Sequence, residues 1–178
     1  NNRKAARIAG RLMGQFLGGT GKIAVVSSAI ASENNNYYVQ VRETEFADFI
    51  HKEYPDIKII TTLDSFEDPQ ITYEKTVKLL RDYQDLQGIY ITCGGVSQVG
   101  RALEESGRAK DIRVISFEDY PEVVDLIRKD VIDCTLAGEL QQQGEIPVQI
   151  IMDYLVFGKE PEQQQIFTDI RVLVKESL

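Results

Sequence analysis

The stretch IRVISFEDYPEVVDLIRKDVIDCTLA (112–137) contains two short apolar runs on either side of an amphipathic segment. The runs at 112–117 and 132–137 have the length and composition of buried strands. The segment from Pro121 to Asp130 carries apolar residues at helical spacing, and proline is favoured at a first helical position. A strand, a helix and a strand in this order predict a right-handed βαβ unit, whose two strands run parallel in one sheet.

The same alternation continues along the rest of the chain. Further strands are expected at 22–28, 57–63, 88–92 and 166–174. Further helices are expected at 3–17, 37–54, 70–86, 96–106 and 141–157. This nearly strict alternation predicts an α/β fold with three layers, in which helices cover both faces of a parallel sheet.

Two glycines, Gly10 and Gly14, lie four residues apart in the predicted helix at 3–17. Residues at this spacing share one face of a helix. Because glycine has no side chain to hold a neighbour away, the spacing predicts close packing against another element.

The predicted helix at 141–157 is apolar around much of its circumference. A helix on the surface of a domain normally has a single apolar stripe, so this one needs burial on two sides. The chain also begins with a helix where an open α/β domain usually begins with a strand. We therefore expect that part of the protein lies outside this sequence.

The composition excludes several classes of protein. The chain has 178 residues, of which 43% are hydrophobic, enough for a sizeable core. A net charge of −8 argues against binding of nucleic acid phosphates by this chain itself. No apolar run approaches the roughly 18 residues that span a membrane, and NNRKAARIAG (1–10) lacks the apolar stretch of a secretory signal. We expect no membrane partner.

Cysteine and histidine are scarce. Cys93 and Cys134 lie at or near the ends of strands that another strand should separate, which favours two free, half-buried thiols over a disulfide. Free thiols favour a reducing compartment, so we expect a cytoplasmic protein. With His51 as the single histidine, the chain has too few ligands for a zinc site, and we expect neither a metal nor a cofactor.

Catalytic patterns are incomplete. GGTGK (18–22) lacks the glycine of a phosphate loop at Phe16 and the hydroxyl residue at Ile23, and it lies between a helix and a strand in the wrong order. A Ser-His-Asp or Cys-His set cannot be assembled around one distant histidine. We therefore do not expect an enzyme.

Four residues lie near the carboxyl ends of predicted strands, where parallel α/β sheets bind ligands: Arg42, Phe66, Gly94 and Glu118. A guanidinium donates to paired hydroxyls, and a carboxylate accepts from them. Phe66 is placed to stack on an apolar sugar face, and Gly94 allows a ligand to approach the helix N-terminus that follows. The Arg42 and Glu118 side chains should lie within roughly 12 Å of each other if they line one site at this edge.

Each of these residues also has an ordinary structural explanation. Arg42 alone would be a solvated charge, Phe66 a core residue and Gly94 a turn glycine. Glu118 and Asp119 are placed to cap the next helix, and Asp119 suits that role better, which leaves Glu118 free. Both interpretations stay open at this stage.

Several segments follow one another in a known order: NNRKAARIAG, GKIAVVSS, RETEFADFI, GIYITCGGVSQVGRALEE, the stretch at 112–144, LVFGKEP and TDIRVLVKE. Together they resemble the effector-binding region of LacI/GalR-type transcription regulators, and also the related type 1 periplasmic sugar-binding proteins. The similarity covers essentially the whole chain. It is best at 112–144, where the family commonly has G-F-D-D, IDAT and QG, and this chain has SFED (116–119), IDCT (132–135) and QG (143–144).

In that family two α/β subdomains clamp a small ligand, usually a sugar or a nucleobase. The resemblance implies a C-terminal effector-binding subdomain at 1–138, a crossover helix at 139–163 that packs on an absent N-terminal subdomain, and a returning terminal strand at 164–178. The implied fold is therefore that of a type 1 periplasmic binding protein, with its N-terminal subdomain largely missing.

The resemblance also assigns roles to residues. Arg42 matches the arginine that holds ligand hydroxyls, Glu118 replaces the ligand-binding aspartate, and Phe66 falls within a residue of a stacking aromatic. The chain departs from the family at Gly94-Gly95, where an Asn-Asp pair is common, and at Gly138, where a polar residue is frequent. Fewer direct polar contacts imply a larger or differently shaped ligand than a simple pentose, or contacts through water.

The predicted function is the effector-sensing, dimerising domain of a LacI-type regulator. It would bind a small sugar-like effector and change operator DNA binding by a helix-turn-helix head outside this chain. Family dimer contacts imply a homodimer interface at Pro121, Val124 and Ile127. One alternative is an exported solute receptor that delivers sugar to a transporter or sensor, and another is an α/β enzyme.

Overall fold

A computed structural model of the chain describes residues 1–28 and 37–178. Its α-helices are α1 (Asn2–Phe16), α2 (Tyr37–Glu53), α3 (Pro69–Asp82), α4 (Val96–Ser106), α5 (Pro121–Arg128) and α6 (Leu140–Phe157). Its strands are β1 (Thr20–Ser27), β2 (Asp56–Asp64), β3 (Gly88–Ile91), β4 (Arg113–Phe117), β5 (Cys134–Gly138) and β6 (Ile170–Leu173). A short 3-10 helix, Lys175–Ser177, follows β6.

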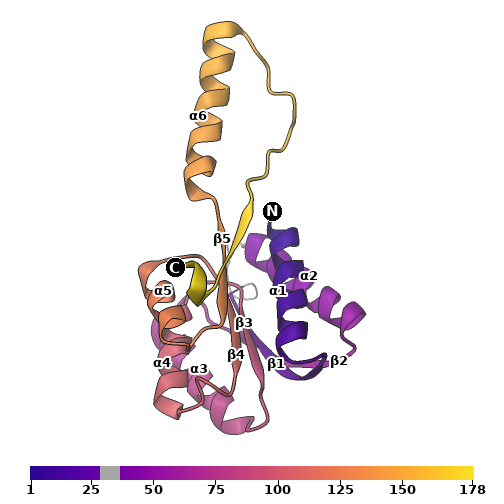
Figure 1. The fold of residues 1–178 in the computed structure, drawn as a ribbon, viewed down its shortest axis with the longest axis vertical. Helices are drawn as coiled ribbons and strands as arrows, with labels where there is room; N and C mark the ends of the chain where they lie inside the picture. Colours follow the sequence, from indigo (N-terminus) through magenta and orange to yellow (C-terminus); the bar gives the residue numbers. More distant parts are fainter. Residues whose placement is uncertain (29–36) are drawn as a thin grey trace.

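The strands form one sheet in the order β2-β1-β3-β4-β5-β6. The first five strands run parallel, and β6 pairs antiparallel with β5. Helices α1 and α2 cover one face of the sheet, and α3, α4 and α5 cover the other (Figure 1). The predicted three-layer α/β fold is confirmed.

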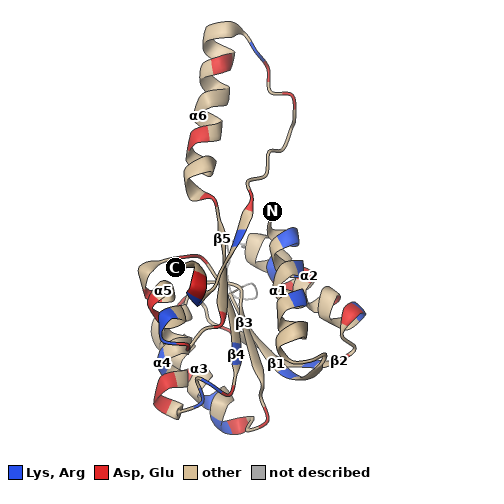
Figure 2. Cartoon of the chain, viewed as in Figure 1, with Lys and Arg blue, Asp and Glu red and all other residues tan. Residues whose placement is uncertain are grey.

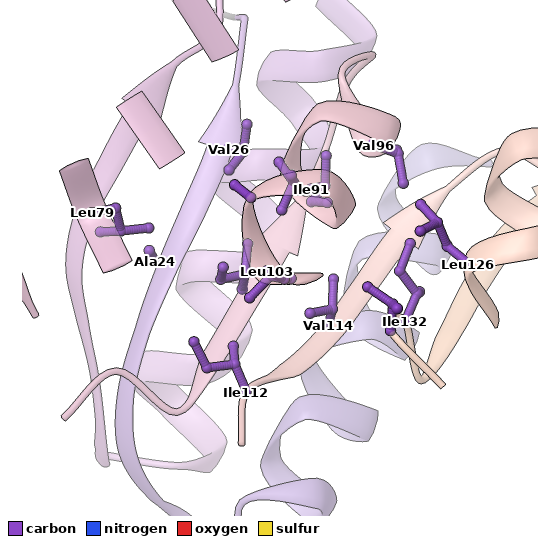
Figure 3. Packing of buried hydrophobic residues seen from close by; sticks show 14 of the residues in the cluster. Ala24, Val26, Leu79, Ile91, Val96, Leu103, Ile112, Val114, Leu126 and Ile132 are labelled. Carbon is purple, nitrogen blue, oxygen red and sulfur yellow. The ribbon is translucent and has the colours of Figure 1, made fainter. Parts of the chain in front are cut away.

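Each face of the sheet has its own core. Aliphatic side chains of β1, β3 and β4 pack against α3, α4 and α5 on one face, as Figure 3 shows for Ile91, Leu103 and Val114. On the other face, the ring of Tyr90 stacks on that of Phe46, with a centroid distance of 4.1 Å. Burial on both faces explains why the strands read as continuous apolar runs.

The last strand differs from its prediction at 166–174, because pairing covers only Ile170–Leu173. The chain leaves the sheet after β5, runs out along α6 and returns beside it, so β6 enters from the opposite direction (Figure 1). Residues 166–169 lie on this return path, where no strand of the described chain pairs with them.

Helix α3 ends at Asp82, whereas 70–86 was predicted. The Arg108 guanidinium donates to backbone carbonyls in the last turn of α3 and in the residues that follow it. The acceptors are Leu80, Tyr83, Gln84 and Leu86, at 2.9, 3.1, 3.0 and 2.9 Å. Backbone carbonyls that would accept hydrogen bonds within a longer helix thus accept them from the side chain of Arg108, which follows α4.

Helix α6 extends beyond the body of the molecule (Figure 1). None of its residues is buried against the part of the chain that the structure describes, and Leu155 is 71% exposed. The sequence of α6 has two charged residues, Glu145 and Asp153, and Figure 2 shows the helix as mostly uncharged. No helix of the described residues is long and apolar enough to cross a membrane.

Both cysteines are free, as the sequence predicted, and they are buried rather than half-buried. Burial raises the pKa of the Cys134 thiol to about 12, and the Asp133 carboxylate contributes in the same direction. The Cys93 thiol lies 3.3 Å from the Ser65 hydroxyl, and burial also raises the pKa of this thiol.

The close packing predicted for Gly10 and Gly14 is confirmed. A methyl group at Gly10 would lie 2.6 Å from Cδ1 of Phe49, and one at Gly14 would overlap the ring of Tyr54. Both partners belong to α2 or the residue just after it, so the two glycines set how closely α1 approaches α2.

Gly14→Ala should therefore lower the free energy of unfolding by about 1–3 kcal/mol, because the methyl group overpacks the interface. The matched control is Gly144→Ala in α6, where no described atom lies within 4 Å of the added methyl group. That change should be neutral or stabilising by up to about 1 kcal/mol through helix propensity. Urea denaturation of both variants measures the difference, and equal effects would contradict the packing described.

The Cys134 thiol predicts a dependence of stability on alkaline pH. Its pKa is raised in the folded chain to about 12, above the roughly 8.5 of an unfolded chain. The unfolded state therefore loses the proton first, so the free energy of unfolding falls as pH rises from about 9 towards 12. The fall should be steeper in the unmodified protein than in Cys134→Ala, by up to about 1.4 kcal/mol per pH unit. Equal slopes between pH 9 and 11 would contradict this.

Candidate ligand-binding site

The carboxyl edge of the sheet has a topological switch point. Strand β1 lies between β2 and β3, so the connections after β1 and β3 turn to opposite faces of the sheet. Sheets of this kind leave a ligand-sized crevice where the two connections diverge. Arg42 of α2 reaches this place, because its Nη1 donates to the carbonyl oxygen of Thr92, directly after β3, at 3.0 Å.

The Arg42 side chain is held on several sides and is only 15% exposed. Its Nε donates to Oδ1 of Asn2 at 2.7 Å, and its Cζ lies 3.8 Å from the centroid of the Phe117 ring. Burial lowers the pKa of this guanidinium, and the Glu118 carboxylate acts in the opposite direction. Arginine remains protonated at neutral pH in such a setting, so the site contains a fixed cation.

Glu118 supplies the counter-charge. Its Oε1 lies 3.5 Å from Nη2 of Arg42, which confirms that the two side chains lie on one edge within the predicted distance. The 3.5 Å separation is longer than a strong hydrogen bond, so both groups keep capacity for a further partner.

The backbone of Glu118 is in the left-handed region, with φ of 73°. Its N–H donates to the carbonyl of Leu136 at 2.9 Å, and the Thr135 hydroxyl donates to its carbonyl at 2.6 Å. Bonds from β5 on both sides thus hold an unfavourable conformation, which directs the carboxylate to the sheet edge.

A cavity of about 810 Å³ lies beside the pair. The edge of the sheet body forms one side, and α6 with its return segment forms the other. The lining residues from the body include Asn2, Tyr38, Arg42, Phe117, Glu118 and Gly138. The volume is in the range of small-molecule sites, and the lining combines aromatic rings with a few polar groups, as such sites do.

Phe66 and Gly94 do not join the described lining of this cavity. Phe66 is 52% exposed, has φ of 52°, and lies under the Lys75 ammonium, 4.4 Å from its ring centroid. Gly94 is exposed in the turn before α4, with no described atom within 4 Å of a methyl group placed there. The structure thus brings together two of the four predicted residues, and ligand contact by Phe66 and Gly94 stays a prediction.

Two predictions for the segment after β4 need correction. Asp119 does not cap α5, because the cap residue is Tyr120 and Asp119 instead accepts from Arg171 at 3.0 Å. Ile127 is 1% exposed and packs inside the core, so its side chain cannot form part of a dimer interface. Pro121 is exposed and Val124 is partly exposed, and their role in a dimer stays a prediction.

Two residues of the site were not found from the sequence. Tyr38 lies four positions before Arg42 on α2, and this spacing on one helix face was an available signal. Asn2 lies 40 positions from Arg42, and nothing in the sequence connects the two.

The described residues contain no group of three or more His, Cys, Asp or Glu side chains that could hold a metal ion. The cavity therefore offers charge and hydrogen bonds from Arg42 and Glu118, together with aromatic surface from Tyr38 and Phe117. This chemistry suits reversible binding of a polar molecule with hydroxyl groups.

Comparison with known protein families identifies the family, because the sequence of residues 1–160 matches the family described as periplasmic binding protein domain. The chain belongs to this family. Among solved structures, this periplasmic binding protein domain is similar to GanP, a glucose-galactose binding protein from Geobacillus stearothermophilus, with a TM-score of 0.88 and 23% identity over 100% of the chain. It is also similar to the sugar-binding protein of a sugar ABC transporter from Bacillus halodurans, with a TM-score of 0.86 and 27% identity over 99% of the chain. The chain spans 61% of GanP and 62% of the Bacillus halodurans protein.

The backbone at Glu118 leads to a prediction that separates strain from charge. Glu118→Gly and Glu118→Ala both remove the carboxylate, but only glycine adopts φ of 73° without steric cost. The glycine variant should therefore be more stable than the alanine variant by about 1 kcal/mol. Thermal or urea unfolding measures the difference, and an alanine variant that is equally stable would show that the conformation is not strained.

Proposed function

We propose that this periplasmic binding protein domain forms one wall of a sugar-binding site in a two-lobed protein. The observation that carries the proposal is the Arg42–Glu118 pair, oriented by fixed contacts at the switch point and open to the cavity. A sugar hydroxyl donates and accepts hydrogen bonds, so it pairs with the carboxylate and the guanidinium at once. Hydroxyls on adjacent carbons fit a pair whose charged atoms lie 3.5 Å apart.

The names of similar proteins support a sugar as the ligand. GanP is a glucose-galactose binding protein, and a solute-binding protein from Burkholderia graminis, with a TM-score of 0.87, was solved with D-arabinose. Tyr38 and Phe117 provide the apolar surface that the carbon face of a sugar requires beside its polar contacts.

The second lobe is proposed to pack against α6 and its return segment. Residues 139–163 would then form the crossover onto that lobe, with the body at 1–138 and the returning strand at 164–178. The exposed apolar side chains on α6 and the return are Leu140, Val148, Ile151, Met152, Tyr154, Leu155, Val156, Phe157, Ile166 and Phe167. A patch of this extent on a soluble protein marks an interaction surface.

Two roles for the complete protein fit this site. The named structural neighbours include sugar ABC transporter and other solute-binding proteins, which supports a solute receptor outside the cytoplasm. The resemblance at 112–144 and the two free, buried cysteines support the LacI-type regulator instead, as a cytoplasmic homodimer whose DNA-binding head lies outside this chain. A helix-turn-helix ahead of this segment in the complete protein would select the regulator, and a secretory signal would select the receptor.

Sugar binding should raise the melting temperature of the complete protein. Of D-glucose, D-galactose, D-arabinose, D-fucose and D-tagatose, at least one should stabilise it by about 2.7 kcal/mol at a hundredfold excess over its dissociation constant. Arg42→Ala should abolish the shift, and Glu118→Gln should weaken binding about tenfold by removing the charged acceptor. Differential scanning fluorimetry and calorimetric titration measure both effects.

The matched control is Arg101→Ala. It removes an exposed guanidinium that pairs with Glu105 along α4, outside the described lining of the cavity, so sugar binding should be unchanged. An unchanged thermal shift in Arg42→Ala, or equal losses in both arginine variants, would contradict the site.

A further inference from the structure

Three contacts define the orientation of the Arg42 guanidinium. The Phe117 ring lies against the guanidinium, with 3.8 Å between Cζ and the ring centroid. With one hydrogen bond in addition, the group could still pivot about that bond. Bonds from two different nitrogens, Nε to Asn2 at 2.7 Å and Nη1 to the Thr92 carbonyl at 3.0 Å, remove that freedom.

We propose that Asn2 is a positioning residue for Arg42, whose amide oxygen directs Nη2 of the guanidinium towards Glu118 and the cavity. The orientation of Arg42 stands on its own, and its importance for sugar binding rests on the proposed function. Of these two acceptors, Thr92 acts through its backbone carbonyl, so Asn2 is the one whose accepting group a substitution removes.

The chemistry of the acceptor matters as well as its place. Asn2 and the Thr92 carbonyl are both neutral, so they orient the cation without balancing its charge. Among the described residues, Glu118 is the carboxylate within 4 Å of the Arg42 guanidinium. An aspartate at position 2 would keep the acceptor and add a second negative charge, which would compete with Glu118 and with the ligand for the same cation.

Asn2 is not the residue that starts the helix. The side chain of Asn1 caps α1 by accepting from the N–H of Lys4 at 3.0 Å. Asn2 follows as the first helical residue, and its side chain is turned to α2 instead. Loss of the cap and loss of the Arg42 contact are therefore separable by neighbouring substitutions.

The test follows the Nε–H signal of Arg42 by NMR in the complete protein labelled with ¹⁵N-arginine, without any ligand. Arg42→Lys assigns the signal. In the unmodified protein the Nε–H proton of Arg42 should exchange slowly with water, and the relaxation of its ¹⁵Nε nucleus should be that of a rigid group. Asn2→Ala and Asn2→Leu, which both remove the acceptor, should shift the signal and make it mobile or lost to exchange. Asn2→Asp should restore it, and Asn1→Ala should leave it rigid.

A rigid, slowly exchanging signal in Asn2→Ala and Asn2→Leu would overturn the proposal, because the contacts with Thr92, Phe117 and Glu118 would then suffice. So would equal loss of the signal in Asn1→Ala, because helix fraying would explain it.

A second arm uses the sugar from the five named above that gives the largest thermal shift. In the otherwise unmodified protein, Asn2→Ala should raise the dissociation constant of this sugar about tenfold. In the Arg42→Lys protein, which lacks the Nε donor, the same substitution should raise it less than about twofold. Equal weakening in both backgrounds would show that Asn2 does not act through Arg42. If none of the five sugars binds, the sugar proposal fails while the NMR result still decides the role of Asn2.

Discussion

The candidate site depends on one largely buried cation whose direction is fixed. The Arg42 guanidinium lies over an aromatic ring and donates to neutral oxygens from two other parts of the chain, and these contacts orient it without neutralising its charge. Glu118, directly after β4, faces this guanidinium. Hydrogen bonds from β5 hold the backbone of Glu118 in a left-handed conformation. Such preorganisation lowers the cost of ordering side chains when a ligand binds. The parallel sheet makes it possible, because it gathers the ends of strands distant in sequence at one edge.

The same edge carries the other unusual part of the fold. Directly after β5 the chain runs into α6, and none of the residues of this helix is buried by the described part of the chain. The return segment brings the chain back to β6, where Arg171 pairs with both Asp119 and Glu139. Arg171 therefore links Glu139, where the chain enters α6, to Asp119, the residue that follows Glu118. An apolar surface beside a polar site is the arrangement that a second lobe closing over a ligand requires.

Most of the fold could be predicted because its signals are local. Apolar runs and helical spacing define the strands and helices, and their alternation predicts βαβ units with parallel strands. The order of the strands in the sheet was not predicted. The proximity of Arg42 and Glu118 was predictable because the carboxyl ends of parallel strands meet at one edge of the sheet, and both residues follow such ends. The Gly10 and Gly14 contacts were also predictable, because small residues at helical spacing permit close approach.

The failures arose where a contact joins parts of the chain that no local pattern connects. The bond from Arg42 to Asn2 and the pairing of Asp119 with Arg171 depend on three-dimensional positions of distant side chains. The true extent of β6 depended on where the returning chain meets β5. Ile127 was assigned to an interface although its place in the α5 stripe buries it.

The most direct test of the account is a crystal structure of the complete protein with the most stabilising sugar bound. The account predicts sugar hydroxyl oxygens about 2.7–3.2 Å from both the Arg42 guanidinium and the Glu118 carboxylate, with the second lobe packed on α6. A sugar bound elsewhere, with Arg42 and Glu118 still paired only to each other, would contradict it.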